Sequence, residues 1–236
     1  MTTLAQLLAE HGAASLDKQE SLAALIGNAG WQFSMDTGRL TFGGKHVFPA
    51  QILGTEAEAS KTWLWGWANA ASGIPAPLLQ FSQQMRTYGE QNGVAEFTSP
   101  ELPVNGVNGH LLCMIASGLC NADAYYRGPY EGGAVFLLFS APQLKAHSDN
   151  SVPRVIRIFT QFIAQSACDH REALMAFLRY KGYACESNGN EVVCTSPRGE
   201  PVRATFDHMG RMTEIAAAAS PAGSPADKKP WWKPGR

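Results

Sequence analysis

The chain lacks the sequence patterns on which most enzyme and metal-site assignments depend. It has no Gly-x-x-x-x-Gly-Lys-Ser/Thr phosphate loop, no Gly-x-Gly-x-x-Gly fingerprint and no Gly-x-Ser-x-Gly nucleophile elbow. Its six histidines form no His-x-His or His-Glu-x-x-His arrangement, and no cysteine lies at metal spacing from them. Kinase, dehydrogenase and hydrolase assignments therefore have no support, and we expect no metal and no cofactor. Sites assembled in space from distant residues are not excluded by these absences.

Long apolar runs and an excess of charge are also missing. The apolar run at residues 134–139, which no other run exceeds, has the length of a strand, whereas a spanning helix needs about 20 apolar residues. Residues 1–26 have no positively charged start, so they do not form a secretory signal. The net charge of −1 argues against nucleic acid, which is normally bound by a basic face. We expect a cytoplasmic protein with no transmembrane segment and no nucleic-acid partner.

The five cysteines include no Cys-x-x-Cys pair and are odd in number, which favours a reducing compartment. Most of them are interpreted as small core residues. Cys185 and Cys194 flank the Asn188-Gly189 turn and can face each other across a hairpin. A disulfide at that pair is the alternative to two free thiols.

The first 150 residues are predicted to form helices packed on an antiparallel sheet. Leucines at helical spacing predict two short N-terminal helices separated by Gly12. Period-two alternation between glycine-containing turns predicts a meander of strands at residues 31–35, 39–42, 46–55 and 61–69. Pro49 cannot donate a ladder hydrogen bond, which places its strand at an edge or a bulge. Further helices are expected at 78–91 and from Asn108 onward, with a strand pair at 124–127 and 134–139.

Three of the six tryptophans, Trp63, Trp65 and Trp67, occupy alternate positions of one predicted strand, so we expect their indoles on one face. That face is either a core wall or a binding wall. Packing is favoured, because large aromatics at strand spacing mostly fill cores. In the alternative, the indoles stack on a flat ligand, a sugar or a cation, and Asn69 at the strand end orients it.

Two further residues are candidates for ligand binding. His110 follows Asn108-Gly109 at a predicted helix start, where a polar N-terminus can hold an anion. The favoured alternative is an ordinary first-turn residue. Tyr125 and Tyr126 point to opposite faces of a strand, so at most one shares a cleft with the indoles, and we retain Tyr126 as the candidate. Core packing is again the favoured alternative.

The segment Thr-Trp-Leu-Trp-Gly-Trp-Ala-Asn at residues 62–69, preceded by Ile-Leu-Gly-Thr at 52–55, resembles a bacterial family known as domain of unknown function 6882. The likeness runs from about Trp31 to Ile215 and includes Tyr125-Tyr126. It implies a shared fold. It implies no reaction or ligand.

Residues 151–216 are predicted to form a smaller region of helices and strands. Asp169 and Glu172 have capping-box spacing, which predicts a helix from His170 to Lys181. Residues 154–164 fit a helix or a strand, and a helix is favoured. Two hairpins are expected, at residues 183–187 with 191–195 and at 202–206 with 211–215. The whole chain is therefore predicted to be α+β, with a main region at 1–150, the small region packed on it, and a tail at 217–236.

The tail is rich in Ala, Ser, Pro and Gly, a composition typical of disorder. Trp231 and Trp232 lie there among basic residues and are candidates for binding a partner or an anionic membrane surface, although incidental aromatics in a solvated end are the favoured interpretation.

The function expected from these features is a non-catalytic binding or accessory protein, of a kind that includes toxin-neutralising proteins. Its protein partner would bind at a surface cleft or at the tail. The alternative is a small-molecule-binding protein or enzyme with a pocket beside residues 63–69. A pocket containing Asn69 and an indole edge favours the alternative, whereas a sealed tryptophan face favours a protein partner.

Overall fold

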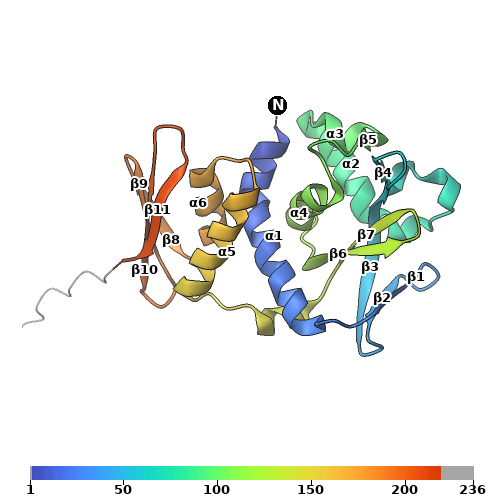
Figure 1. Ribbon diagram of the computed structural model, residues 1–236, viewed down its shortest axis with the longest axis horizontal. Coiled ribbons are helices and arrows are strands. Elements are labelled where there is room, and N and C mark those ends of the chain that lie inside the picture. Colours follow the sequence, from blue (N-terminus) through green and yellow to red (C-terminus); the bar gives the residue numbers. More distant parts are fainter. Residues whose placement is uncertain (1, 219–236) are drawn as a thin grey trace, which may run out of the picture.

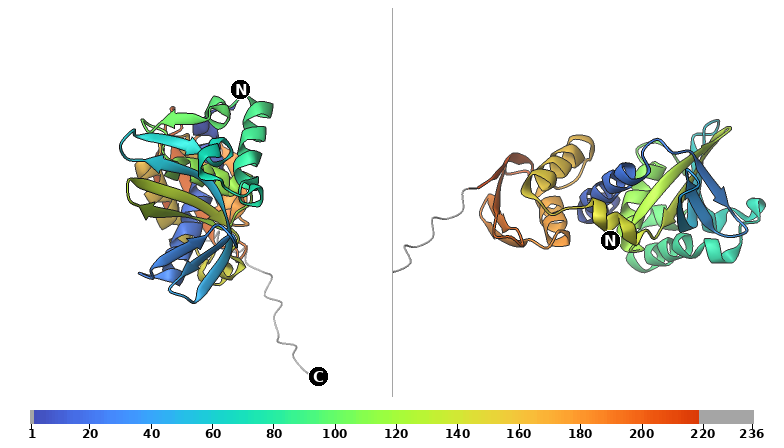
Figure 2. Two further views of the ribbon diagram at one scale, coloured as in Figure 1. Left: turned by 90° about the vertical axis from the view of Figure 1, so that its right-hand side faces the viewer. Right: turned by 90° about the horizontal axis from the view of Figure 1, so that it is seen from below.

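The computed structural model describes residues 2–218, so Trp231 and Trp232 lie outside the described residues. Helix α1 (Leu4–Ile26) separates a large antiparallel sheet with its helices from a smaller C-terminal unit (Figure 1). The view from below shows these two parts on opposite sides of α1 (Figure 2). The α+β class, with an antiparallel sheet and a smaller C-terminal helix-and-strand region, is confirmed.

Helix α1 is continuous, so the prediction of two short helices separated by Gly12 was wrong. Thr3 caps the helix, and its hydroxyl oxygen accepts a hydrogen bond from the Gln6 backbone N–H. Gly12 is buried in the helix interior, where an added Cβ would lie 2.4 Å from a ring carbon of Phe162. The glycine therefore permits close packing of a neighbouring helix and does not break α1.

The large sheet contains seven strands in the described part of the chain, and every pairing is antiparallel. The strands are β1 (Trp31–Ser34), β2 (Arg39–Phe42), β3 (His46–Ala57), β4 (Thr62–Trp65), β5 (Glu101–Pro103), β6 (Ala124–Tyr130) and β7 (Gly133–Phe139). β1 to β4 form the expected meander, while β7 pairs with both β3 and β6. β3 pairs with β2, β4 and β7, so the edge position that Pro49 predicted for its strand was wrong. At Pro49 itself β3 pairs with β2 alone, because the ladder between β3 and β7 begins at Ala50.

The tryptophan strand is shorter than predicted. β4 ends at Trp65, and the short 3-10 helix η1 (Gly66–Ala68) follows it. The backbone N–H of Trp67 donates to the Ser82 hydroxyl of helix α2 (Gln80–Asn92), at 3.0 Å, instead of joining a sheet ladder. The strand therefore contains Trp63 and Trp65 but not Trp67. A 3-10 turn, η3 (Ala76–Leu78), leads into α2, and the short helix α3 (Ala95–Thr98) follows it.

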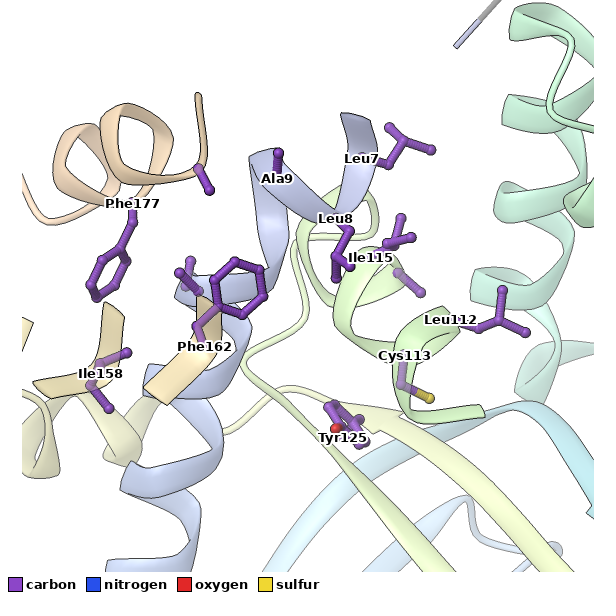
Figure 3. Close-up of a cluster of buried hydrophobic side chains, with 14 of the residues drawn as sticks. Leu7, Leu8, Ala9, Leu112, Cys113, Ile115, Tyr125, Ile158, Phe162 and Phe177 are labelled. Atoms are coloured by element: carbon purple, nitrogen blue, oxygen red, sulfur yellow. The ribbon is translucent and has the colours of Figure 1, made fainter. Parts of the chain in front are cut away.

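The main hydrophobic core extends across both sides of α1 (Figure 3). Leu112 and Ile115 of helix α4 (Gly109–Leu119) supply one side. Phe162 of helix α5 (Val152–Gln165) and Phe177 of helix α6 (His170–Tyr180) supply the other. A second cluster lies around β1 to β3 and contains Leu40, Phe42, Phe48 and Phe139.

The C-terminal unit joins α5 and α6 to a four-stranded antiparallel sheet in the order β11-β10-β9-β8. Its strands are β8 (Ala184–Asn188), β9 (Glu191–Thr195), β10 (Pro201–Phe206) and β11 (Met212–Ala217). Both hairpins, the helix at 154–164 and the Asp169 cap, which accepts from the Glu172 N–H, are confirmed. Val202 pairs with Ala217, so β11 includes residue 217. The predicted tail, which starts at residue 217, therefore starts one residue too early.

Cys185 and Cys194 lie opposite each other on β8 and β9, with their Cα atoms 4.1 Å apart, and they form a disulfide. The favoured expectation of free thiols was therefore wrong at this pair. Cys113, Cys120 and Cys168 are free, and the first two are buried as expected.

Candidate functional site

Trp63 and Trp65 are fully buried, and their rings meet edge to face with centroids 5.3 Å apart. Phe136 packs on Trp63, and Phe97 packs on Trp65. The indole N–H of Trp65 donates to the Glu96 carbonyl oxygen at 2.9 Å. The favoured interpretation, core packing, is confirmed for these two indoles. These two rings fill the core and present no surface to a ligand.

Trp67 and Asn69 lie beyond the end of β4 and do not continue its face. The Arg86 guanidinium covers the half-buried Trp67 ring at 4.6 Å from the centroid. The Asn69 side-chain oxygen accepts from the Ser72 backbone N–H at 3.3 Å and caps a short 3-10 helix, η2 (Ala70–Ser72). Neither Trp67 nor Asn69 lines the two hollows that adjoin α1.

His110 and Tyr126 are not brought together with the tryptophans in a common cleft. The N-terminus of α4 is occupied by the chain's own carboxylate, since Glu56 Oε1 accepts from the Gly109 N–H at 2.6 Å. His110 Nδ1 lies 3.2 Å from the Tyr125 hydroxyl. Burial lowers the pKa of His110, an effect opposed by Glu56. Tyr126 packs on Trp31 and Phe42 in the second core cluster.

The largest hollow that we describe is a groove of about 890 Å³ along α1, which we call the α1 groove. Small residues of α1, including Ala5, Ala9 and Ala14, line it together with Gly118 at the end of α4. Helix α6 contributes Glu172, Ala176, Arg179 and Tyr180, and Asp169 lies just before that helix. The groove therefore lies where the C-terminal unit meets the rest of the chain.

Charges of opposite sign occupy different ends of the α1 groove. Lys18 of α1 lies over the Tyr180 ring at 5.6 Å from the centroid, which brings the end of α6 close to this lysine. Glu10 precedes Lys18 by eight residues on α1, and Glu172 precedes Tyr180 by eight residues on α6. At about 1.5 Å per residue, each pair of positions is separated by about 12 Å along its helix axis.

His11 is the imidazole of the α1 groove. Its Nε2 atom is buried and has no hydrogen-bond partner within residues 2–218, and its closest carboxylate oxygen is Glu10 Oε2, at 3.9 Å. Gly118 makes room for the ring, since an added Cβ would lie 2.4 Å from two His11 ring atoms. Burial lowers the pKa of His11; Glu10 opposes this effect and Lys18 adds to it.

The lowered pKa of His11 predicts a pH dependence of stability. The unfolded chain, with an imidazole pKa of about 6.5, binds a proton more readily than the folded chain. We therefore expect stability to be full above about pH 6.5 and to fall as the pH drops below it, with His110 acting in the same direction. Thermal melts from about pH 8 to about pH 5, on both sides of the imidazole pKa, measure this dependence.

The matched variants for this prediction are His11→Phe, which keeps a ring, and His208→Gln in an exposed turn. His11→Phe should flatten the acid decline of the melting temperature, while His208→Gln should leave it unchanged. An acid decline equally steep in the parent and in His11→Phe would contradict the assignment.

A second hollow, of about 410 Å³, shares Lys18 and Tyr180 with the α1 groove. Beneath it, a buried cluster links α1 to the C-terminal unit. The Asp17 carboxylate, on a residue 1% exposed, accepts from Arg154 Nε at 2.6 Å and from Lys181 Nζ at 2.9 Å. The Ser148 hydroxyl donates to the same carboxylate at 3.1 Å.

Sequence reasoning missed His11, Asp17 and Lys18. One signal was available: Asp17 stands at helical spacing between Ala13 and Ser21, on the buried face of α1. A carboxylate on such a face indicates a buried cationic partner. The partners come from residues more than 130 positions away, which no local pattern identifies.

Within the part of the chain that the structure describes, no group of three or more His, Cys, Asp or Glu residues could hold a metal ion. A search of residues 2–218 likewise finds no helix with the length and apolar character needed to cross a bilayer.

Comparison with known proteins identifies one family. No curated protein and no solved structure matches the chain. The model of the family of unknown function DUF6882 matches residues 5–142, from α1 to the start of η4 (Pro142–His147). The match thus begins before Trp31 and ends well before Ile215, so the expected extent of the likeness was wrong at both ends. Because it covers more than half of the chain, the protein belongs to the DUF6882 family of unknown function.

Proposed function

We propose that this protein is a non-catalytic binding protein whose α1 groove receives a segment of a protein partner. The observation that carries the proposal is the groove itself, which combines a floor of small residues with charges of both signs along its sides. Small side chains let another backbone approach α1 closely. The charges distinguish the two ends of a bound segment, since one end is acidic and the other is basic.

The dimensions of the groove suit a peptide segment. From Ala5 to Lys18, α1 rises by about 20 Å. An extended segment of about six residues or a helical segment of about 13 residues spans that length. An acidic residue near one end of the segment would meet Lys18 and Arg179, and a basic residue near the other would meet Glu10 and Glu172.

The lining also favours binding over catalysis. A nucleophilic mechanism needs a hydroxyl or thiol within hydrogen-bond reach of a base. Thr2 and Tyr180 bring hydroxyl groups to the lining, but His11 Nε2 has no hydrogen-bond partner among the described residues. The sealed packing of Trp63 and Trp65 removes the main support for a ligand pocket beside residues 63–69.

This proposal includes the accessory role expected from the sequence, such as toxin neutralisation in the cytoplasm of a bacterium. The tail would add a second contact through Trp231 and Trp232, whose indoles supply large contact areas to a partner.

Filling the groove tests the proposal. Ala5 is exposed and lines the groove, so Ala5→Trp obstructs it without entering the core. Ala176→Trp does the same from α6. We expect either change to weaken partner binding at least about tenfold, while the melting temperature stays close to that of the parent. Affinity is measured on a partner recovered by pull-down from the native host and then purified.

The matched control is Ala24→Trp, an equally large change at an exposed alanine of α1 outside the groove lining. It should bind the partner like the parent. Recovery of a partner whose affinity is the same for all three variants would refute the groove as its binding site.

A further inference from the structure

We infer that the second hollow binds a small anion through carboxylate or phosphate oxygens. We call it the lysine hollow, because Lys18, Lys145 and Lys181 line it together with Asp17, Ser148 and Tyr180. Its volume of about 410 Å³ falls in the range typical of small-molecule sites. The inference does not rest on the proposed partner segment.

Two of the lysines are held in place by the fold and keep donor capacity. Lys181, 3% exposed, donates to Asp17 Oδ2 at 2.9 Å and to the Ser148 hydroxyl at 3.1 Å. Lys18 donates to the Ala122 carbonyl at 2.8 Å and, more weakly, to the Ser117 carbonyl at 3.4 Å. An ammonium group carries three donors, so each of them has one N–H left for an anion.

The carboxylates around the lysine hollow are already engaged. The Asp17 carboxylate accepts from three donors, Arg154, Lys181 and Ser148. Asp123 Oδ2 accepts from the Ala141 N–H at 2.7 Å. Asp149 lies between Ser148 and Asn150, which both line the hollow, and its carboxylate accepts from both the N–H and the hydroxyl of Ser151.

The charge of the lining is therefore positive. Three ammonium groups and two carboxylates line the hollow, and Arg154 and Asp149 next to it add one charge of each sign, so one positive charge remains in excess. Partial burial strengthens the attraction of these fixed charges for an anion relative to bulk water. Tyr180 and Asn150 line the same hollow, and a hydroxyl and a side-chain amide are groups that can donate to further oxygens of the anion.

Titration calorimetry with inorganic phosphate and, separately, with citrate tests the inference at constant ionic strength. We expect saturable binding of at least one probe in the range below about 10 mM, and the preferred probe distinguishes phosphate from carboxylate ligands. Lys145→Gln removes an exposed lining charge and should weaken binding about fivefold or more. Lys18→Met should weaken it further, and circular dichroism verifies the fold of that variant.

Lys45→Gln is the control, since it removes the same charge from an exposed turn far from the lining in sequence. It should bind the probe like the parent. No saturable binding of either probe, or binding that Lys145→Gln and Lys18→Met both leave unchanged, would overturn the inference. Ala5→Trp, which fills the α1 groove, should retain anion binding, so failure of one proposal is distinguishable from failure of the other.

Discussion

Replacing Asp17 with alanine should lower the free energy of unfolding by about 3 to 5 kcal/mol, which is the cost of breaking a buried ion pair from one side. Asp17 is 1% exposed, and its carboxylate accepts from Arg154, Lys181 and Ser148. Without it, the Lys181 ammonium stays buried with no counter-charge. Urea unfolding at neutral pH, followed by circular dichroism, measures the loss.

A triple variant separates lost charge pairing from lost packing. Asp17→Leu together with Arg154→Met and Lys181→Met replaces both ion pairs of Asp17 by apolar side chains, which should recover a large part of the stability lost in Asp17→Ala. Asp36→Ala, in an exposed turn, should change stability by less than about 0.5 kcal/mol. The interpretation fails if Asp17→Ala is as mild as Asp36→Ala.

Replacing Trp63 with alanine should cost about 3 to 5 kcal/mol, because the indole is fully buried and its removal leaves a cavity. The ring fits closely against the backbone, since an added Cβ on Gly54 would lie 2.3 Å from one of its carbons. The rings of Trp65 and Phe136 pack edge to face against the Trp63 indole. Those neighbours are held by the sheet and can collapse into the cavity only in part. Thermal and urea unfolding both measure the effect.

Trp67→Ala is the matched comparison, because this residue is half-buried and follows the strand end. It should cost clearly less than Trp63→Ala. Equal losses in the two variants, or a Trp63→Ala protein that melts like the parent, would contradict the packing assignment.

Local sequence signals predicted the elements whose structure is decided locally. Alternation and turn residues identified β1 to β4, and the Asp169 cap identified the start of α6. Asn108 was correctly placed at the start of α4, where its side chain accepts from the Leu111 N–H. In each case the interaction that defines the element lies within a few residues along the chain.

The errors occurred where a distant partner decides the structure. Gly12 resembles a helix breaker in the sequence, but in the fold it allows Phe162 to pack closely on α1. Trp67 continues the alternating pattern in the sequence, but its backbone N–H donates to the Ser82 hydroxyl and not to a neighbouring strand. The pairing of β7 with β3 joins segments about 80 residues apart.

The candidate site was harder to predict than the fold. The α1 groove and the lysine hollow combine α1 with residues after position 115, and their side chains are individually unremarkable in sequence. The run of tryptophans stands out in the sequence because such a composition is rare. In the structure, Trp63 and Trp65 are fully buried and fill the core.

The packing of α1 extends beyond the region that the family match covers. The DUF6882 match contains α1 but ends at residue 142, whereas one face of this helix is covered by Phe162 and Lys181 from beyond that end. A chain cut where the family match ends would expose that face, including the Asp17 carboxylate, to water. Relatives with no equivalent C-terminal unit must therefore carry a different residue pattern on this side of α1 or cover it with another molecule.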